Sequence, residues 1–234
     1  MGDSYIYKNQ KKLRWGYTTG TCAAAASLAA AVMLLQGRRM EQVSLTTPKG
    51  VRLDLEVEEM DTGENRVSCG VRKDAGDDPD VTDGLMVYSQ VRLPDADSVD
   101  VSGAGGDYVY EKDGLRLNLS GGVGVGRVTQ CGLSCEVGKA AINPVPRQMI
   151  FEQVAGVCRE SGFKGVLSIE IRVPGAFKVA DKTFNSRLGI RGGISILGTS
   201  GMVEPMSETA LLDTIRLELR QRIRKGEKNL LVTP

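Results

Sequence analysis

Residues 73–84, "KDAGDDPDVTDG", place five aspartates in one short segment: Asp74, Asp77, Asp78, Asp80 and Asp83. Carboxylate oxygens are ligands for Mg²⁺ or Ca²⁺ and can also act as general bases. Their order does not match an EF-hand loop, which needs Asp at alternate positions and a distal Glu. Asp, Gly and Pro are also common turn formers, and solvent screens repulsion between exposed carboxylates. The residues alone therefore favour a solvated turn over a metal site or a set of carboxylates that cap N–H groups or face a ligand.

Three segments rich in glycine or hydroxyl residues have the composition of anion-binding turns. Thr19 and Thr21 in "YTTGTCAAAA" stand at a predicted helix start, where the macrodipole favours an anion, although N-capping explains them equally well. The turn Gly198, Thr199, Ser200 and Gly201, between a buried strand and a helix, is the best local position for the polar end of a cofactor, but ordinary turns share this composition. "SGGVGVGRVT" is a weak phosphate signal because no convincing helix follows it.

Three arginines lie among prolines and glycines, outside regular charged helix faces. Arg147 follows Asn143 in "NPVPRQM", and Arg187 and Arg191 follow Asn185 in "FNSRLGIRGG". A guanidinium can form two parallel hydrogen bonds to a carboxylate, although a solvated surface role explains each arginine singly. The three together favour recognition of an acidic ligand.

Composition excludes several kinds of chemistry. The 234 residues contain no histidine, so the Ser-His and Cys-His nucleophile pairs are excluded. The five cysteines lack CxxC spacing, which predicts reduced thiols and no zinc ribbon. The formal net charge of +1 argues against nucleic-acid binding. Because the N-terminus lacks an apolar signal core and the apolar run 22–35 is shorter than the roughly 20 residues of a membrane span, we expect a cytoplasmic protein.

The elements that must position these residues are predicted by periodicity and capping. A helix starts at Thr18–Thr21 and stops at Gly37, and a second follows Pro144 and Pro146 and ends before Gly162. Alternating residues predict strands at 42–47 and 51–60, joined by a turn at 48–50, and at 66–71, 85–93 and 165–175. Short strands are predicted within 98–120, at 98–103 and 108–120, with a hairpin turn at 112–114. The pattern is that of an α+β domain with a mostly antiparallel or mixed sheet and packed helices.

The last part of the chain changes character. A short buried strand at 193–197, a long helix and a second strand at 228–234 predict a βαβ unit. Leu211, Ile215, Leu219 and Ile223 recur every fourth residue, so we expect the helix to bury this stripe. With a boundary near Ser186–Gly193, residues 1–190 form one domain and residues 191–234 the start of an α/β domain that we expect to be cut short.

The segments together resemble the CbiD family, the cobalt-precorrin-5B C1-methyltransferases of anaerobic cobalamin biosynthesis. The resemblance runs in order through almost the whole chain and rests on these blocks: "WGYTTGTCAAAA", "RKDAGDDPDVTDG", "GVGRVTQCGL", "AINPVPRQMI", "VADKTFNSRLGIRGGISILGTSGMVEPMSE" and "NLLVTP". It implies methyl transfer from S-adenosylmethionine to C1 of a cobalt-bearing tetrapyrrole, giving cobalt-precorrin-6A. Cobalt is then part of the substrate, and no metal site on the protein is expected.

This resemblance directs the site hypotheses. Residues 1–190 become the tetrapyrrole domain, and residues 191–234 begin the donor domain, with Gly198–Gly201 as donor contacts. We expect Asp77 and Asp78 to act near the sulfonium or near a proton lost after methylation. The expected substrate contacts are Thr19, Thr21, Lys73, Asn143, Arg147, Asn185, Arg187 and Arg191.

No nucleic-acid or membrane partner is expected, and a homo-oligomer is compatible with the sequence. A truncated, non-catalytic tetrapyrrole-binding module is the main alternative, and a nucleotide-phosphate enzyme ranks last because no Walker lysine is present.

Overall fold

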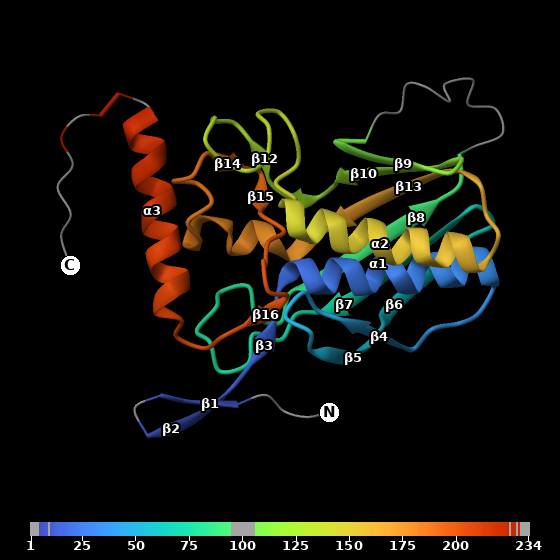
Figure 1. Ribbon diagram of the computed structural model, residues 1–234, viewed down its shortest axis with the longest axis horizontal. Helices are drawn as coiled ribbons and strands as arrows, with labels where there is room; N and C mark the ends of the chain where they lie inside the picture. The colour runs from blue at the N-terminus through green and yellow to red at the C-terminus, as the bar shows by residue number, and fades with distance from the viewer. Residues whose placement is uncertain (1–4, 9, 95–105, 225, 228, 230–234) are drawn as a thin grey trace.

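The computed structural model describes residues 5–8, 10–94, 106–224, 226, 227 and 229. A six-stranded sheet forms the main body, and two long helices, α1 (Thr19–Gln36) and α2 (Pro144–Glu160), lie side by side against it (Figure 1). A third helix, α3 (Glu208–Arg224), stands at one end of this body. The protein is α+β, which confirms the predicted class.

The sheet is mixed. Its strands, in spatial order, are β6 (Glu58–Thr62), β7 (Arg66–Arg72), β8 (Met86–Arg92), β13 (Gly165–Arg172), β10 (Leu115–Gly121) and β9 (Tyr108–Lys112). Within it, β10 and β13 are parallel and the other neighbouring pairs are antiparallel. Because α2 connects β10 to β13 along the chain, β10–α2–β13 is a βαβ unit that the sequence did not reveal.

The predicted βαβ unit at residues 193–234 is not borne out by the described residues. β15 (Gly193–Ile194) instead pairs in parallel with β11 (Gly124–Val125). The second strand of that prediction, at 228–234, lies almost wholly outside the described residues, as does the strand predicted at 98–103. Strand pairing is decided by contacts distant in sequence, which a local pattern does not specify.

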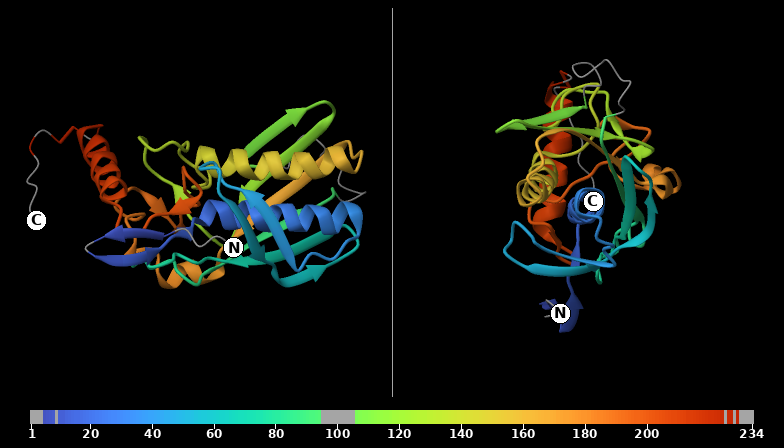
Figure 2. Two further views of the ribbon diagram at one scale, coloured as in Figure 1. Left: turned by 60° about the horizontal axis from the view of Figure 1, so that its bottom comes forward. Right: turned by 90° about the vertical axis from the view of Figure 1, so that its right-hand side faces the viewer.

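Helix α1 is the centre of the core. Thr18 is its N-cap and accepts a hydrogen bond from the Thr21 amide, and Gly37 closes it in the left-handed conformation, as predicted. The figure shows α1 end-on between the sheet and the pair β4 (Gln42–Thr46) and β5 (Arg52–Glu56), with α2 beside it (Figure 2). Its alanines and Gly20 allow this close packing: a Cβ on Gly20 would meet Pro146 Cγ at 2.6 Å.

By length and composition α1 is apolar enough to cross a membrane, but 78% of it is buried inside the fold. It is therefore explained as the core helix of the sheet. Leu117 and Leu119 on β10 and Leu167, Ile169 and Ile171 on β13 are fully buried in the same core. Each such side chain contributes about 1.5–3 kcal/mol by burial. The alternating apolar residues that predict β13 therefore also stabilise its packing in the core.

Shorter elements surround this body. They are the hairpin β1 (Tyr5–Lys8) and β2 (Lys11–Arg14), the pair β3 (Gly16–Tyr17) and β16 (Met202–Val203), the pair β12 (Arg127–Val128) and β14 (Ile190–Arg191), and the 3-10 turns η1 (Pro174–Lys178) and η2 (Ala180–Lys182). The β3–β16 pair brings the start of α1 beside the approach to α3. Segments far apart in sequence therefore meet at one end of the molecule (Figure 1).

The apolar stripe of α3 is not buried by the described residues. Leu211 is 55% exposed, Ile215 40% and Ile223 64%, and within this helix Gln221 is the residue that is buried. The prediction of a buried stripe is therefore wrong for the described structure. Spacing identifies an apolar face but does not supply a surface that covers it.

Candidate functional site

The acidic segment is a turn between β7 and β8 whose aspartates are all hydrogen-bonded. Asp74 forms a two-pronged ion pair with Arg14, with Nη1–Oδ2 at 2.6 Å and Nη2–Oδ1 at 2.7 Å, and its Oδ1 accepts from the Gly76 amide. The hydrogen bond from Arg14 holds the pKa of Asp74 below its usual range. The segment is a turn, as predicted, but its carboxylates bind backbone amides and cations, which is the alternative that the sequence ranked below a solvated turn. Arg14, from a distant strand, is the partner of Asp74.

Buried Lys73 and half-buried Asp80 form a second ion pair. Lys73 Nζ lies 2.5 Å from Asp80 Oδ2, and only 2% of the Lys73 side chain is exposed. Asp80 also accepts from the amide and hydroxyl of Thr82. Burial raises the pKa of Asp80, but the charge and hydrogen bond of Lys73, together with the Thr82 bonds, outweigh it, so the net pKa is lowered. Lys73, predicted as a substrate contact, is thus used inside the fold.

The remaining aspartates hold backbone amides. Asp77 Oδ2 accepts from the Arg14 amide at 2.6 Å, Asp78 Oδ1 from the Met206 amide at 2.8 Å, and Asp83 Oδ1 from the Ala75 amide at 2.7 Å. Lys8 binds the carbonyls of Pro205 and Met206, so strand β1 and the turn converge on the approach to α3. The catalytic role expected for Asp77 and Asp78 stays a prediction, and the geometry gives both a tethering role. No group of three or more His, Cys, Asp or Glu side chains in the described ranges could hold a metal ion.

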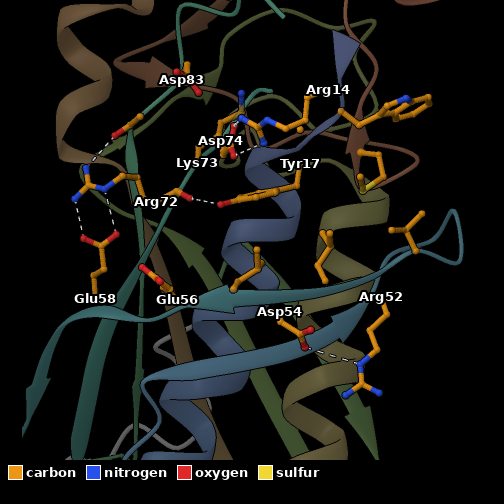
Figure 3. Close-up of a pocket in the computed structure, with 17 residues that line it drawn as sticks. Arg14, Tyr17, Arg52, Asp54, Glu56, Glu58, Arg72, Lys73, Asp74 and Asp83 are labelled. Carbon is orange, nitrogen blue, oxygen red and sulfur yellow. Dashed lines mark hydrogen bonds and ion pairs between the residues drawn. The ribbon is translucent and has the colours of Figure 1, made fainter. Parts of the chain in front are cut away.

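A cleft of about 670 Å³ opens beside this turn (Figure 3). Its large apolar residues are Trp15, Tyr17, Leu53, Leu55 and Met202, and Met202 pairs with Tyr17 across β16 and β3. Five carboxylates (Asp54, Glu56, Glu58, Asp74 and Asp83) and four cations (Arg14, Arg52, Arg72 and Lys73) also line it. The cleft therefore combines flat apolar surface with both charge signs.

Tyr17 and Arg72 are fixed in place at the cleft. The Tyr17 hydroxyl donates to the Arg72 carbonyl at 2.9 Å, and the Arg72 guanidinium donates to both oxygens of Glu58, at 3.1 and 2.8 Å (Figure 3). Burial raises the pKa of Tyr17, so the phenol is neutral and acts as a hydrogen-bond donor. Hydrogen bonding to Glu58 raises the pKa of Arg72. Trp15 carries Lys49 Nζ at 3.6 Å from its ring centroid, a cation–π contact.

The start of α1 is covered by the turn at 197–201. Thr19 Oγ1 accepts from the Leu197 amide at 3.0 Å, and Thr21 Oγ1 donates to the Gly201 carbonyl at 2.7 Å. The Gly20 amide also donates to the Leu197 carbonyl. Gly198 is required here because its φ is +130° and a Cβ would meet Thr18 Oγ1 at 2.2 Å. The helix start predicted to bind an anion is thus occupied by the turn predicted to bind a cofactor.

Within that turn, the side chains differ in access. Ser200 Oγ hydrogen-bonds within the turn to the amide and carbonyl of Met202. Thr199 is exposed and lines a separate cavity of about 350 Å³ between α2 and the β4–β5 turn. Of the four predicted donor contacts, Thr199 is the one whose side chain is exposed.

The predicted arginines and asparagines lie in two places. Asn143 is the N-cap of α2, and Arg147 in its first turn stacks on Tyr108, with Cζ 4.0 Å from the ring centroid. Asn185 is buried and accepts from Ser195 Oγ at 2.9 Å, while Arg187 and Arg191 are exposed on the segment that it anchors. The predicted contacts do not form one cluster with Lys73.

Apart from Lys73, Asp74 and Asp83, the residues that line the cleft were missed by sequence reasoning. Trp15 and Tyr17 directly precede the N-cap Thr18, and aromatic residues beside a helix start could have been noticed. Arg52 and Arg72 belong to alternating strands, where the pattern gives them the same appearance as any solvated face. The five cysteines are all free thiols, and burial raises the pKa of Cys22 and Cys69 to about 12, so neither is a thiolate nucleophile at neutral pH.

The sequence profile of the family described as CbiD matches residues 6–205. This chain belongs to the CbiD family. It is 48% identical over 232 residues to the cobalt-precorrin-5B C(1)-methyltransferase of Ruminiclostridium cellulolyticum, covering 99% of this chain and 56% of that protein. It is 51% identical to the protein of the same name from Thermoanaerobacter sp., covering 98% of this chain and 57% of that one.

A solved structure is also similar to this CbiD chain. The crystal structure of the cobalamin biosynthesis protein CbiD from Archaeoglobus fulgidus has 32% sequence identity and a TM-score of 0.58, with 91% of this chain and 62% of that chain covered. The CbiD chain spans a little over half the length of the curated relatives that it matches.

Proposed function

We propose that this CbiD chain belongs to an S-adenosylmethionine-dependent methyltransferase that methylates C1 of cobalt-precorrin-5B, giving cobalt-precorrin-6A in cobalamin biosynthesis. The observation that carries the proposal is the 48–51% identity, over 98–99% of the chain, to two proteins named for this reaction. The protein acts in the cytoplasm, and cobalt enters within the substrate.

The reaction requires alignment more than a reactive side chain. A new C–C bond forms at the nucleophilic ring carbon while the S–CH₃ bond breaks, and sulfur keeps the electron pair. Orientation of the two reactants supplies about 7–11 kcal/mol of the barrier in well-aligned systems. A chain without histidine suits this chemistry, because no covalent enzyme intermediate is needed.

The charges of the cleft beside the acidic turn favour the donor over the acceptor. The acceptor carries many carboxylates, whereas S-adenosylmethionine carries a sulfonium and an ammonium beside one carboxylate. More carboxylates than cations line the cleft, and Trp15 and Tyr17 offer flat surfaces for an adenine. We place the donor in this cleft. Glu56, an exposed carboxylate on β5, is the proposed partner of the sulfonium.

The domain division at residues 190 and 191 stays part of this proposal. Met202 lines the cleft and directly follows the turn at 198–201, so the segment assigned to the donor domain reaches the proposed donor site. The apolar stripe on α3 is exposed, and we propose that a further surface packs against it. A second copy of the chain or another part of the protein would supply that surface equally well.

The proposal is tested with the purified chain, cobalt-precorrin-5B and S-adenosylmethionine labelled in its methyl group. We expect label in the corrinoid product, and calorimetric binding of both S-adenosylmethionine and S-adenosylhomocysteine. Binding of the ring without binding of donor or transfer would instead support a non-catalytic tetrapyrrole module.

The control for the donor cleft is a matched pair of charge-neutral variants. Glu56→Gln should weaken S-adenosylmethionine by about fivefold, or about 1 kcal/mol for a partly exposed charge pair, and S-adenosylhomocysteine much less because it lacks the sulfonium. Glu41→Gln, on an exposed residue paired with Arg39 outside the cleft, should change neither affinity. Equal affinities for both ligands in Glu56→Gln and the unaltered chain would remove the donor from this cleft.

A further inference from the structure

A second large cavity lies between the first turns of α2 and strand β9. Its volume is about 900 Å³, and it shares no lining residue with the cleft beside the acidic turn. Lys139 and Arg147 are its cations, Asp107 and Glu152 its carboxylates, and Tyr108, Tyr110 and Phe151 its aromatic residues. Arg147 alone among these is a predicted substrate contact, so the cavity gathers residues that no sequence pattern connected.

Arg147 carries a charge that the described residues do not neutralise. Its guanidinium lies on the face of Tyr108, 4.0 Å from the centroid, and its Nε is buried without a hydrogen-bond partner. No carboxylate in the described part of the chain lies within ion-pair distance of it. Buried polar groups are normally paired, and an arginine held by an aromatic ring while its charge stays uncompensated is arranged to receive an anion.

The carboxylates in the cavity wall are engaged elsewhere. Asp107 binds Arg127 and the Gly121 amide, and Glu152 accepts from Gln148 Nε2 at 2.7 Å. Lys139 adds a second cation 5.4 Å from the same Tyr108 ring, and its partner Glu136 is highly exposed, so that pair is weakened by solvent. The wall therefore holds two cations, Arg147 and Lys139, and one carboxylate, Glu152, that has no ion pair among the described residues. Arg147, with its buried Nε, is the cation that these acids leave unpaired.

The aromatic groups are positioned rigidly. The Tyr108 hydroxyl donates to the Ala140 carbonyl at 2.7 Å, which fixes the ring beneath Arg147. Tyr110 and Phe151 stack with centroids 5.7 Å apart and an interplanar angle of 27°. Flat apolar surface beside fixed cations fits a planar ring that carries carboxylates at its edge.

We propose that Arg147 and Lys139, supported by Tyr108, form a subsite that binds carboxylate side chains of a planar polycarboxylate ring. The identification of that ring as the methyl acceptor rests on the proposed function. The subsite shares no lining residue with the donor cleft, and its ligand is opposite in charge to the donor.

The subsite is tested by binding alone, with uroporphyrin, a planar tetrapyrrole that carries only acetate and propionate side chains. Quenching of the porphyrin fluorescence gives the affinity. Arg147→Gln should weaken binding by about 10- to 100-fold, the range for loss of a charge-assisted contact. Arg147→Lys should restore part of the affinity because the charge returns without the planar fork, and Lys139→Gln should have a smaller effect.

Two controls separate recognition from charge and folding. Arg159→Gln removes the same charge from the exposed, opposite end of α2 and should leave the affinity unchanged. Tyr108→Phe keeps the ring under Arg147 and should retain binding, whereas Tyr108→Leu should lose it. Far-ultraviolet circular dichroism and thermal melting check that each variant is folded, and the methyl ester of uroporphyrin should bind the unaltered chain weakly.

Several outcomes would overturn the subsite: no saturable binding of uroporphyrin to the unaltered chain, equal affinity in folded Arg147→Gln, or equal affinity for the ester. These outcomes leave methyl transfer to be judged by the labelled-methyl assay. Conversely, absence of transfer together with Arg147-dependent ring binding would reject the proposed function and retain the subsite.

Discussion

At the scale of single residues, the acidic turn shows how five close carboxylates are tolerated. Each accepts a hydrogen bond, and the two strongest arrangements use Arg14 on Asp74 and buried Lys73 on Asp80. A buried lysine is costly without its counter-charge, so Asp80 is needed for folding rather than for chemistry. The opposite case is Arg147, whose charge has no such internal partner among the described residues.

Asp80→Asn should lower the free energy of unfolding at neutral pH by about 3 kcal/mol, since it leaves the Lys73 charge buried and unpaired. The folded-state pKa values of Asp80 and Asp74 are lowered, so their stabilisation is present above the unfolded Asp pKa of about 3.9 and is lost as pH falls through the folded values. The unaltered chain should therefore lose stability below about pH 4, and Asp80→Asn less steeply.

Urea titrations at a series of pH values measure both effects. Asp61→Asn is the control, because its pair with Arg66 is mostly exposed and should be worth less than about 1 kcal/mol. Equal stability of Asp80→Asn and the unaltered chain would show that Lys73 is not held as the structure indicates.

At the scale of elements, the start of α1 contacts a turn that lies almost 180 positions later in the sequence. Thr18 caps the helix, and Thr19 and Thr21 bind the turn at 197–201. The same turn reaches α2, because the Asn143 amide donates to the Ile196 carbonyl. One backbone segment, 196–197, therefore accepts a hydrogen bond from the first turn of α1 and one from the N-cap residue of α2.

Thr18→Ala should lower the free energy of unfolding by about 1–2 kcal/mol, the cost of losing an N-cap oxygen. Thr18→Ser keeps that oxygen and should be close to the unaltered chain. Chemical denaturation monitored by circular dichroism measures the difference. A loss of equal size in both variants would mean that the methyl group, and not the cap, is responsible.

At the scale of the whole molecule, the body and α3 are stabilised differently. The body has a continuous core around α1, α2 and the sheet, whereas the apolar stripe of α3 is open in the described structure. Gln221 fixes α3 by a hydrogen bond to the Leu188 carbonyl at 2.9 Å. Stability of the body is therefore expected to be nearly independent of that stripe.

The double variant Leu211→Lys, Ile215→Lys should change the free energy of unfolding by no more than about 0.5 kcal/mol per site, because both side chains are exposed. Leu167→Ala in the core is the comparison and should cost about 2–5 kcal/mol. Urea midpoints measure both. A core-sized loss in the double variant would show that the stripe is buried in solution.

Local sequence signals correctly predicted the elements that are determined by neighbouring residues. The caps of α1, the alternation of β13 and the turn at Asp113–Gly114 joining β9 to β10 each depend on neighbouring residues, and each lies where the sequence predicts it. The glycine-rich, arginine-containing and aspartate-rich blocks also resemble the CbiD family without reference to their contacts, and the family profile confirms that membership.

The pairing of β10 with β13, the exposure of α3 and the partners of each charge became known from the fold. Arg14 meets Asp74 across 60 positions of sequence, and Met206 meets Asp78 across 128. Two basic residues therefore differ in their surroundings: Lys73 is buried and paired with Asp80, whereas Arg147 has no ion-pair partner among the described residues. Charge and spacing are properties of the chain, but burial and neutralisation depend on which distant segments pack beside each group, and the folded structure alone specifies that packing.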